Sequence, residues 1–189
     1  MLLSYSLLSS AFRKEYRVLH TSQSYFELFG LSAQYDIDED ALSVTYLKLQ
    51  RQFHPDKFAA ATAQQQRVAL QFATTINEAY ECLKHPVQRA EYLMKQAGHD
   101  HEEHTMQSDG AFLFQQMEWR EALEMASNST ALESIVAETQ GALEQYQRGF
   151  DQAFSLQDYQ TAQLNIDKMQ FVYKFSAELQ QKADSITEA

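Results

Sequence analysis

Two stretches with helical periodicity are separated by the pentapeptide Phe53-His54-Pro55-Asp56-Lys57. Before it, apolar side chains recur at steps of four, three and four residues, at Leu42, Tyr46, Leu49 and Phe53. This spacing places them on one face of a helix. Pro55 ends that helix, because proline donates no backbone hydrogen bond and disfavours helical geometry in the residue before it. His54 and Asp56 are therefore predicted to lie at the exposed tip of a turn.

A second helix is predicted directly after this turn. Thr62 and Gln65 have the spacing of a capping box at its start, and Pro86 stops it. Its apolar stripe consists of Val68, Phe72, Ile76, Ala79 and Leu83. Pro86 can also open a third, short helix that ends near Gly98 and carries Val87, Ala90 and Leu93 or Met94. Together with a short apolar helix at residues 25–30, these segments predict an antiparallel helical hairpin with short helices beside it.

The rest of the chain predicts three more amphipathic helices, the first at about residues 109–126 and the last at about 158–185. The stripe of the middle helix is the most regular and consists of Leu132, Val136, Thr139, Leu143, Tyr146, Phe150 and Ala153. Three such helices joined by short loops are typical of an antiparallel bundle. The prediction is an all-α protein with an N-terminal extension (1–23), a first helical domain (24–97), a linker (98–108) and a C-terminal three-helix bundle (109–189).

Composition excludes several classes of protein. The 189 residues include only 5 Gly and 2 Pro, too few for the many turns of a β-sandwich or barrel. One Cys excludes a disulfide framework and a Cys-based zinc site. The net charge of −11 argues against a general nucleic-acid binder. No apolar run is long enough for a transmembrane helix, so we expect neither a nucleic acid nor a membrane as partner.

A group of cations nevertheless lies beside the turn. Lys48 and Arg51 fall on a face of the first long helix outside its apolar stripe, and Lys57 follows the turn. Basic side chains on an acidic chain are suited to an acidic partner. At the tip, the imidazole of His54 can donate a hydrogen bond and the carboxylate of Asp56 can pair with an arginine. We therefore expect this end of the hairpin to bind a protein.

The same residues resemble the J-domain family. The matching segments are Tyr25-Phe26-Glu27-Leu28-Phe29-Gly30-Leu31, Tyr46-Leu47-Lys48-Leu49, the pentapeptide 53–57 and Ile76-Asn77-Glu78-Ala79-Tyr80-Glu81-Cys82-Leu83. More narrowly, residues 24–189 resemble the HscB co-chaperones of iron–sulfur cluster assembly. That resemblance adds Arg89-Ala90-Glu91-Tyr92-Leu93, residues 111–121 and Asp167-Lys168-Met169-Gln170-Phe171. At Trp119 the bacterial members more often carry an aliphatic residue, so the resemblance does not predict the packing at this position.

The resemblance implies a co-chaperone that is not an enzyme and holds no cofactor or metal. It implies that the J domain stimulates the ATPase of HscA, a DnaK-type chaperone, through His54, Pro55, Asp56 and Lys57, with Lys48 and Arg51 beside them. It also implies that the bundle holds the scaffold protein IscU through Leu113, Met117 and Phe171. The chain lacks the Cys-rich zinc element often found in mitochondrial members, so we expect a cytoplasmic bacterial protein, with the mitochondrial matrix as the alternative.

The residues around the implied scaffold site have the composition of an interface. Leu113 and Met117 lie one helical turn apart, beside the expected core stripe of Phe112, Trp119 and Leu123. Their neighbours are Phe114, Glu118, Arg120 and Glu121. A small apolar patch with a charged rim is typical of protein interfaces. The same spacing also fits a broad core face, and both interpretations remain open at this point.

Three further interpretations stay beside the main one. The chain could serve a general DnaK-type chaperone with another client. His99, His101 and His104 with the neighbouring acidic residues could bind a divalent metal, although their spacing matches no standard site. Residues 1–23 are interpreted as a disordered or wrongly assigned start, and the alternative is a transit peptide, which they partly resemble through Arg13, Lys14 and Arg17. We expect this extension to be dispensable.

Overall fold

A computed structural model describes residues 24–99 and 109–187. The chain divides into two compact units between Arg89 and Ala90. The first unit contains α2 (Tyr25–Phe29), α3 (Glu39–Phe53), the short 3-10 helix η2 (Pro55–Phe58), α4 (Ala63–Lys84) and the start of α5 (Pro86–Gln96). The second contains the rest of α5 with α6 (Gly110–Met125), α7 (Ser129–Ser155) and α8 (Tyr159–Thr187). The all-α prediction is confirmed, whereas the extension 1–23 and most of the linker 98–108 lie outside the described residues.

The helix ends follow from local side chains. Ser24 and Asp38 cap α2 and α3 by accepting hydrogen bonds from Glu27 N and Ala41 N. Gly30 ends α2 in the left-handed conformation, with φ 69°. The predicted capping box of Thr62 and Gln65 is present at the start of α4. These groups satisfy backbone amides and carbonyls that the helices themselves leave unpaired, and so they set where each helix begins and ends.

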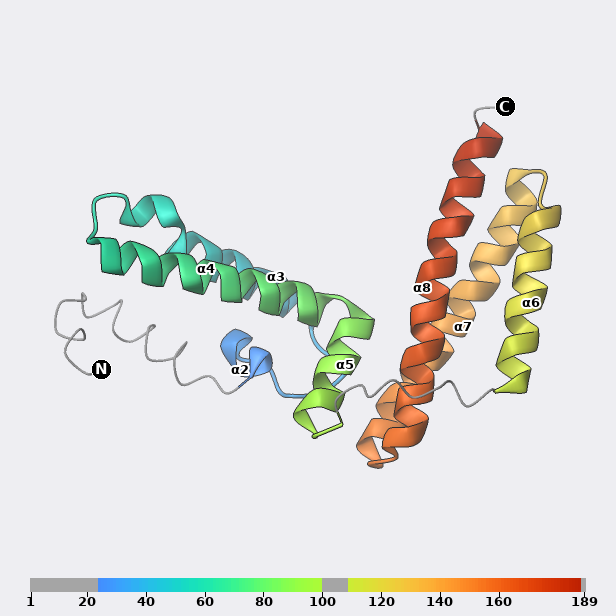
Figure 1. Ribbon diagram of the computed structural model, residues 1–189, viewed down its shortest axis with the longest axis horizontal. Helices are drawn as coiled ribbons and strands as arrows, with labels where there is room; N and C mark the ends of the chain where they lie inside the picture. Colours follow the sequence, from blue (N-terminus) through green and yellow to red (C-terminus); the bar gives the residue numbers. More distant parts are fainter. Residues whose placement is uncertain (1–23, 100–108, 188–189) are drawn as a thin grey trace. The chain divides into compact units, whose positions relative to one another are not determined.

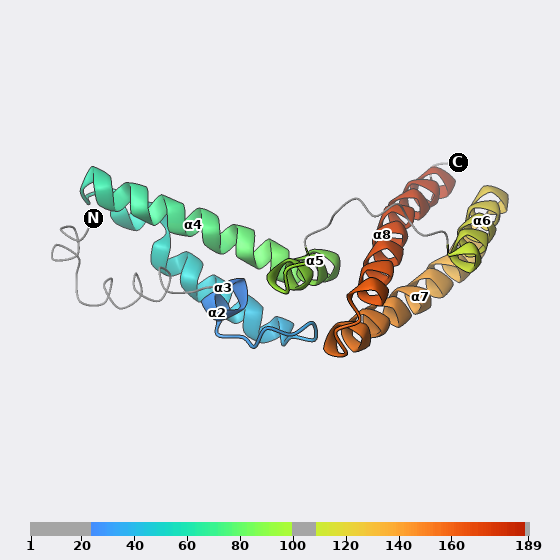
Figure 2. The same ribbon diagram turned by 60° about the horizontal axis from the view of Figure 1, so that its bottom comes forward.

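The hairpin of α3 and α4 forms the body of the first unit, and the two helices lie side by side in both views (Figures 1 and 2). Phe53 and Phe72 meet edge to face with ring centroids 5.4 Å apart, and both are buried. Further along, the rings of Tyr46 and Tyr80 stack with centroids 3.9 Å apart. Each fully buried Phe or Leu contributes about 1.5–3 kcal/mol to stability. The hairpin is therefore held together along its length, and the turn at its end is supported by the buried Phe53.

A buried arginine joins α5 to this hairpin. Arg89 Nη1 donates to the Leu83 carbonyl at 2.9 Å and lies 3.4 Å from Glu39 Oε1. Its guanidinium also lies over the ring of Tyr35, 5.1 Å from the centroid. The guanidinium therefore connects the end of α4, the start of α3 and the loop between α2 and α3.

In the second unit, α7 and α8 form a long antiparallel pair against which α6 packs (Figure 1). The core of this pair includes Leu143, Phe150, Ile166, Met169, Val172 and Phe175. One predicted core position is wrong: Val136 is half exposed, and Ile135 is buried in its place. Adjacent helical residues differ by about 100° in direction, so either residue fits a pattern of threes and fours, and the packing of neighbouring helices selects one.

Within residues 24–99 and 109–187, no helix combines the length and the apolar composition needed to span a membrane.

Candidate functional site

The turn between α3 and α4 presents the His-Pro-Asp tripeptide to solvent. Pro55 begins η2, where its fixed φ suits the first helical position and its missing N–H costs nothing. His54 is the C-cap residue of α3 and the N-cap residue of η2. In its N-cap role, its carbonyl accepts from Lys57 N at 3.0 Å and its Nδ1 accepts from Asp56 N at 3.3 Å. The side chains of His54 and Asp56 are 53% and 91% exposed. The tripeptide is thus held by its own backbone, while its side chains are left available to a partner.

The hydrogen bond to Nδ1 determines which ring nitrogen of His54 can donate a hydrogen bond to a partner. An Nδ1 that accepts from the Asp56 amide carries no proton, so the neutral ring has its proton on Nε2. The Asp56 carboxylate lies 3.6 Å from the same Nδ1, and an ion pair between them would require an Nδ1–H in place of that acceptor. In the structure, Nδ1 is the acceptor of the amide hydrogen bond. His54 then presents Nε2–H as a donor, and Asp56 presents a free carboxylate as an acceptor.

A groove of about 500 Å³ lies beside the tip and is lined by Val44, Leu47, Lys48, Arg51, Gln52 and Lys57. The structure therefore brings the three predicted cations, Lys48, Arg51 and Lys57, to one place. The two apolar members were missed by the sequence argument. A signal was present, because the inner face of α3 is already filled by Leu42, Tyr46, Leu49 and Phe53, which leaves Val44 and Leu47 on another face.

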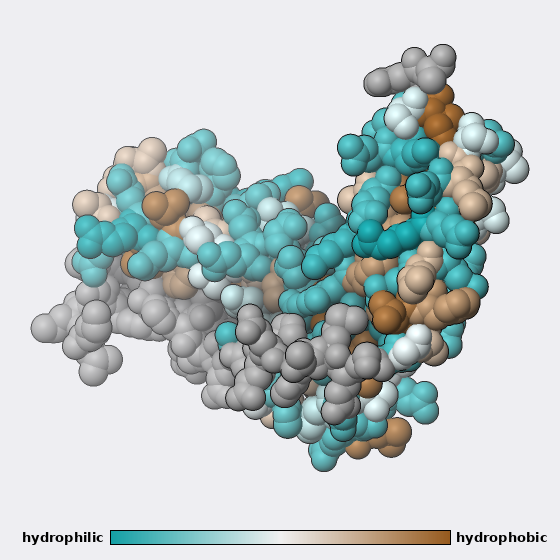
Figure 3. Space-filling view, turned by 45° about the vertical axis from the view of Figure 1, so that its right-hand side comes forward, coloured by the Kyte–Doolittle hydropathy of each residue, from teal (hydrophilic) through white to brown (hydrophobic). Residues whose placement is uncertain are grey.

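The bundle exposes the predicted apolar patch on α6. Leu113, Phe114 and Met117 are 51%, 62% and 61% exposed, whereas Phe112 and Trp119 are buried. The interpretation of the three as part of a broad core face is therefore wrong. Glu118, Arg120 and Glu121 are exposed on the same helix. Figure 3, in which α6 comes forward, shows hydrophobic side chains gathered on this face among hydrophilic ones.

Phe171 occupies a different position from the exposed patch residues. It is half-buried on α8, in a row of aromatic rings under α6, with centroids 5.6 Å from Phe112 and 6.2 Å from Trp119. The guanidinium of Arg120 lies 5.7 Å from the Phe171 centroid. Since Phe112 and Trp119 lie on the same helix as Leu113 and Met117, Phe171 supports the helix that carries the patch.

Trp119 has a polar partner that explains how this side chain is accommodated. Its Nε1–H donates to Glu138 Oε1 on α7 at 2.8 Å, and Gln115 Nε2 donates to the same oxygen at 3.1 Å. A buried indole requires such an acceptor, because an unpaired N–H away from water is costly. Neither the separation of 19 residues nor the helical pattern pointed to this pair.

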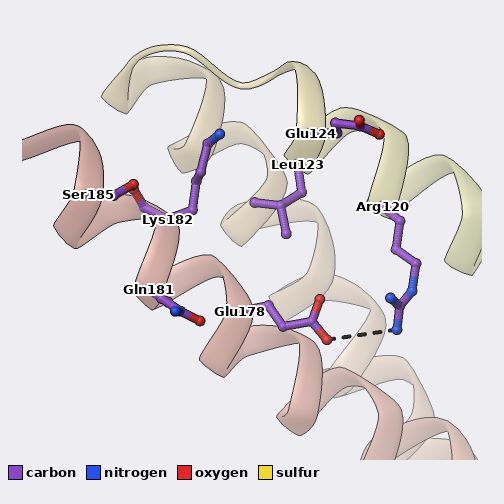
Figure 4. A pocket seen from close by; sticks show the side chains of 7 residues that line it. All are labelled: Arg120, Leu123, Glu124, Glu178, Gln181, Lys182 and Ser185. Atoms are coloured by element: carbon purple, nitrogen blue, oxygen red, sulfur yellow. Dashed lines mark hydrogen bonds and ion pairs between the residues drawn. The ribbon is translucent and has the colours of Figure 1, made fainter.

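A second groove, of about 440 Å³, follows the patch toward the other end of α6, and Arg120 lines it (Figure 4). Arg120 Nη2 lies 3.8 Å from Glu178 Oε1 on α8 across the groove. Leu123, expected in the core stripe, is half-buried and faces this space. The remaining lining residues are Glu124, Gln181, Lys182 and Ser185.

The start of α6 is fastened to α8 by an ion pair. Asp109 caps α6 by accepting from Phe112 N, and its Oδ2 also accepts from Lys168 Nζ at 2.6 Å. Lys168 Nζ further lies over the rings of Phe112 and Tyr146, 5.4 and 5.6 Å from their centroids. The hydrogen bond from Lys168, followed by that from Phe112 N, lowers the pKa of Asp109 below its ordinary value. Asp109 thereby holds the helix that carries the apolar patch.

Asp109→Asn should lower the free energy of unfolding by about 0.5–1 kcal/mol at pH 7, after allowance for the partial exposure of the pair. Asparagine can keep the helix cap through its Oδ1, so the variant removes the charge and the acceptor for Lys168 Nζ. Because the folded-state pKa of Asp109 is lowered, its stabilisation is present above the ordinary carboxyl pKa and is lost as pH falls through the lowered value. Denaturant unfolding at several pH values should show the two proteins converging in acid. A difference that persists unchanged in acid would contradict the assignment.

The possible metal ligands are only partly described. His99 is exposed after the end of α5, and His101 and His104 lie outside the described residues. In the part of the chain that the structure covers, no three His, Cys, Asp or Glu side chains are grouped as a metal site would require. The lone thiol, Cys82, is half-buried, and its Sγ lies 3.6 Å from the Gln88 carbonyl.

Comparison with known proteins matches the N-terminal and the C-terminal helical regions to two different families. The DnaJ domain family matches residues 24–92, and the family described as HSCB C-terminal oligomerisation domain matches residues 108–180. The "Co-chaperone protein HscB homolog" of Shewanella halifaxensis is 40% identical over 173 residues, which cover 88% of this chain and 98% of that protein. Its counterpart in Neisseria meningitidis is 42% identical over 160 residues, covering 82% and 96%.

Solved structures agree with these matches. Chaperone HscB from Vibrio cholerae superposes with a TM-score of 0.77 at 34% identity, over 87% of this chain and 99% of that one. Human co-chaperone protein HscB gives a TM-score of 0.81 at 26% identity, over 86% and 83%. The Shewanella and human relatives are named as co-chaperones, and the Vibrio cholerae relative is named as a chaperone.

Proposed function

The chain belongs to the HscB family of J-domain co-chaperones, and on that premise we propose that it stimulates the ATPase of an HscA-type chaperone and delivers an IscU-type scaffold protein to it. The observation that carries the proposal is the exposed His54-Pro55-Asp56 turn at the end of the α3–α4 hairpin. The imidazole donor of His54 and the carboxylate of Asp56 face solvent, and the cations Lys48, Arg51 and Lys57 lie beside this turn. This combination is suited to a partner surface with an acceptor, an arginine and several carboxylates.

Delivery of the scaffold protein is supported by the exposed patch on α6. Leu113, Phe114 and Met117 form its apolar centre, and Glu118, Arg120 and Glu121 form its charged rim. Apolar centres with polar rims provide most of the affinity of protein interfaces. Phe171 contributes through the aromatic row under α6 and through the smaller part of its surface that remains accessible.

The mechanism is coupling through a shared chain. A co-chaperone that holds the client by its bundle and the ATPase by its J domain raises the local concentration of client at the chaperone. Hydrolysis is then stimulated where the client is already present, so nucleotide turnover and client capture are linked. The J domain and the bundle act on different partners, and each can therefore be inactivated separately.

ATPase measurements with purified proteins test this function. We expect the chain to stimulate an HscA-type chaperone when added alone, and to stimulate it further when an IscU-type protein is added. A general DnaK-type chaperone is the comparison, since it represents the alternative partner. Equal stimulation of both chaperones, with no effect of the IscU-type protein, would favour the general role. No stimulation of either would refute the proposal.

A further inference from the structure

The helix that carries the exposed patch has few buried side chains of its own. Of the 16 residues of α6, Phe112 and Trp119 are buried, whereas the neighbouring α7 buries six side chains. A helix that packs on a core usually buries three to four residues in every two turns. Apolar packing therefore fixes the rotation of α6 about its own axis less firmly than that of α7. The polar contacts of α6 gain importance for the same reason.

Glu138 on α7 holds α6 through a buried side chain. Its Oε1 accepts from Trp119 Nε1 at 2.8 Å and from Gln115 Nε2 at 3.1 Å. Trp119 is 2% exposed, and a buried indole N–H is costly to leave unpaired. The ion pair of Arg120 with Glu178, by contrast, joins side chains that are 58% and 45% exposed, where charge pairs contribute little. Glu138 is therefore the stronger polar constraint on the middle of α6.

The two donors to Glu138 lie on the side of α6 opposite the patch. Gln115 and Trp119 are one helical turn apart, as are Leu113 and Met117, and the two pairs are offset by two residues. At about 100° per residue, this offset is about 200° around the helix. One carboxylate oxygen thus binds two successive turns on the back of α6. Because both bonds would have to lengthen, the arrangement resists rotation of the helix in either direction.

From this arrangement we propose that Glu138 is a positioning residue for the scaffold-binding patch. It acts through Trp119 and Gln115 and not by contacting the client. By holding the back of α6 on α7, it keeps Leu113 and Met117 pointing outward before the client arrives. Groups that are already oriented bind more tightly, because less motion has to be restrained on binding. The inference deepens the proposed function and rests on it, since the patch is proposed there to bind an IscU-type protein.

The test is Glu138→Leu, assayed by calorimetric titration with an IscU-type protein. Leucine retains the helix propensity of glutamate and removes the acceptor. We expect the dissociation constant to rise about five- to tenfold, because an indole N–H without its acceptor favours rotation of α6 away from the binding position. Glu138→Gln keeps an Oε1 acceptor, and it should restore the dissociation constant to within about twofold of the parent value.

Glu133→Leu is the matched control. Glu133 is an exposed glutamate on the same helix as Glu138, so this variant removes the same charge and introduces the same side chain. It should leave the dissociation constant unchanged. Circular dichroism and denaturant unfolding of each variant show that the affinities compare folded proteins.

Hydrogen exchange follows the bond itself. Trp119 is the one tryptophan among the 189 residues, so a single indole N–H resonance reports on it. This proton should exchange slowly with solvent in the parent chain and in Glu138→Gln, and faster in Glu138→Leu. It should stay protected when the IscU-type protein binds, because the client occupies the opposite side of α6.

Trp119→Phe removes the donor in place of the acceptor and keeps an aromatic ring in the core. It should weaken binding in the same direction as Glu138→Leu. The double variant should bind no more weakly than Glu138→Leu alone, because both changes remove the same interaction. If Glu138→Leu loses helical content, Trp119→Phe decides, and an affinity equal to that of the parent chain would reject the proposal.

Other results would also overturn it. Parent-like affinity in Glu138→Leu, with faster indole exchange, would make Glu138 a structural residue only, while binding by the parent chain upholds the proposed function. Affinity as weak in Glu138→Gln as in Glu138→Leu would assign the effect to charge and not to the hydrogen bond. An equal loss in Glu133→Leu would mean the same for the surface of α7 as a whole. A parent chain that binds no IscU-type protein would refute both the positioning role and the proposed function.

Discussion

His54→Gln is expected to reduce stimulation of the chaperone ATPase to the basal rate without unfolding the chain. The side chain is half exposed and its ring contacts its own turn, where Nδ1 accepts from Asp56 N. Glutamine provides a donor and an acceptor, but not at the positions of Nε2 and Nδ1 on a rigid ring. Both the outward donor and the hydrogen bond that holds Asp56 are therefore lost. Circular dichroism should be unchanged while the stimulated turnover disappears.

His99→Gln is the control for this substitution, because His99 is an exposed histidine outside the hairpin turn. It should stimulate like the parent chain. Full stimulation by His54→Gln would be incompatible with the assigned role of the His-Pro-Asp turn. Loss of helical content in that variant would show instead that His54 contributes to folding.

Leu113→Ala/Met117→Ala should weaken binding of an IscU-type protein by about 2–4 kcal/mol. The two side chains are exposed in the free chain and would be buried at the centre of the interface, where each truncation costs about 1–3 kcal/mol. Their removal creates no cavity in the core, so the free energy of unfolding should change little. Calorimetric titration of the two proteins measures the effect. Stimulation of the chaperone ATPase in the absence of client should persist, because the hairpin turn is unaltered.

Val136→Ala/Leu156→Ala removes comparable exposed apolar surface from α7 and the loop after it, and should leave the affinity unchanged. If the α6 variant binds like this control, the patch is not the scaffold site. Adding Phe171→Ala to the α6 variant should bring the loss to about 3–6 kcal/mol at most, because contributions at one interface are not additive. Phe171 also packs on Phe112 and Trp119, so the stability of this triple variant has to be measured with its affinity.

Local signals in the sequence were sufficient to locate the helices and the hairpin turn. Pro55 ends α3, Gly30 ends α2, and Thr62 with Gln65 starts α4, since each acts on the backbone within a few residues of itself. The exposure of His54 and Asp56 follows from the same argument, because a tight turn at the end of a hairpin leaves its side chains few neighbours. For these features, residue type and spacing are the physical cause.

Tertiary packing settled the features that depend on which helix lies opposite. A pattern of threes and fours could not distinguish Val136 from Ile135, nor an exposed patch at Leu113 and Met117 from a core face, because each helix face is buried only if another element covers it. The contacts of Trp119 with Glu138 and of Asp109 with Lys168 join residues 19 and 59 positions apart, and no local rule relates them. Val44 and Leu47 are exposed because α4 covers the other face of α3 and leaves these two side chains beside the cations Lys48, Arg51 and Lys57.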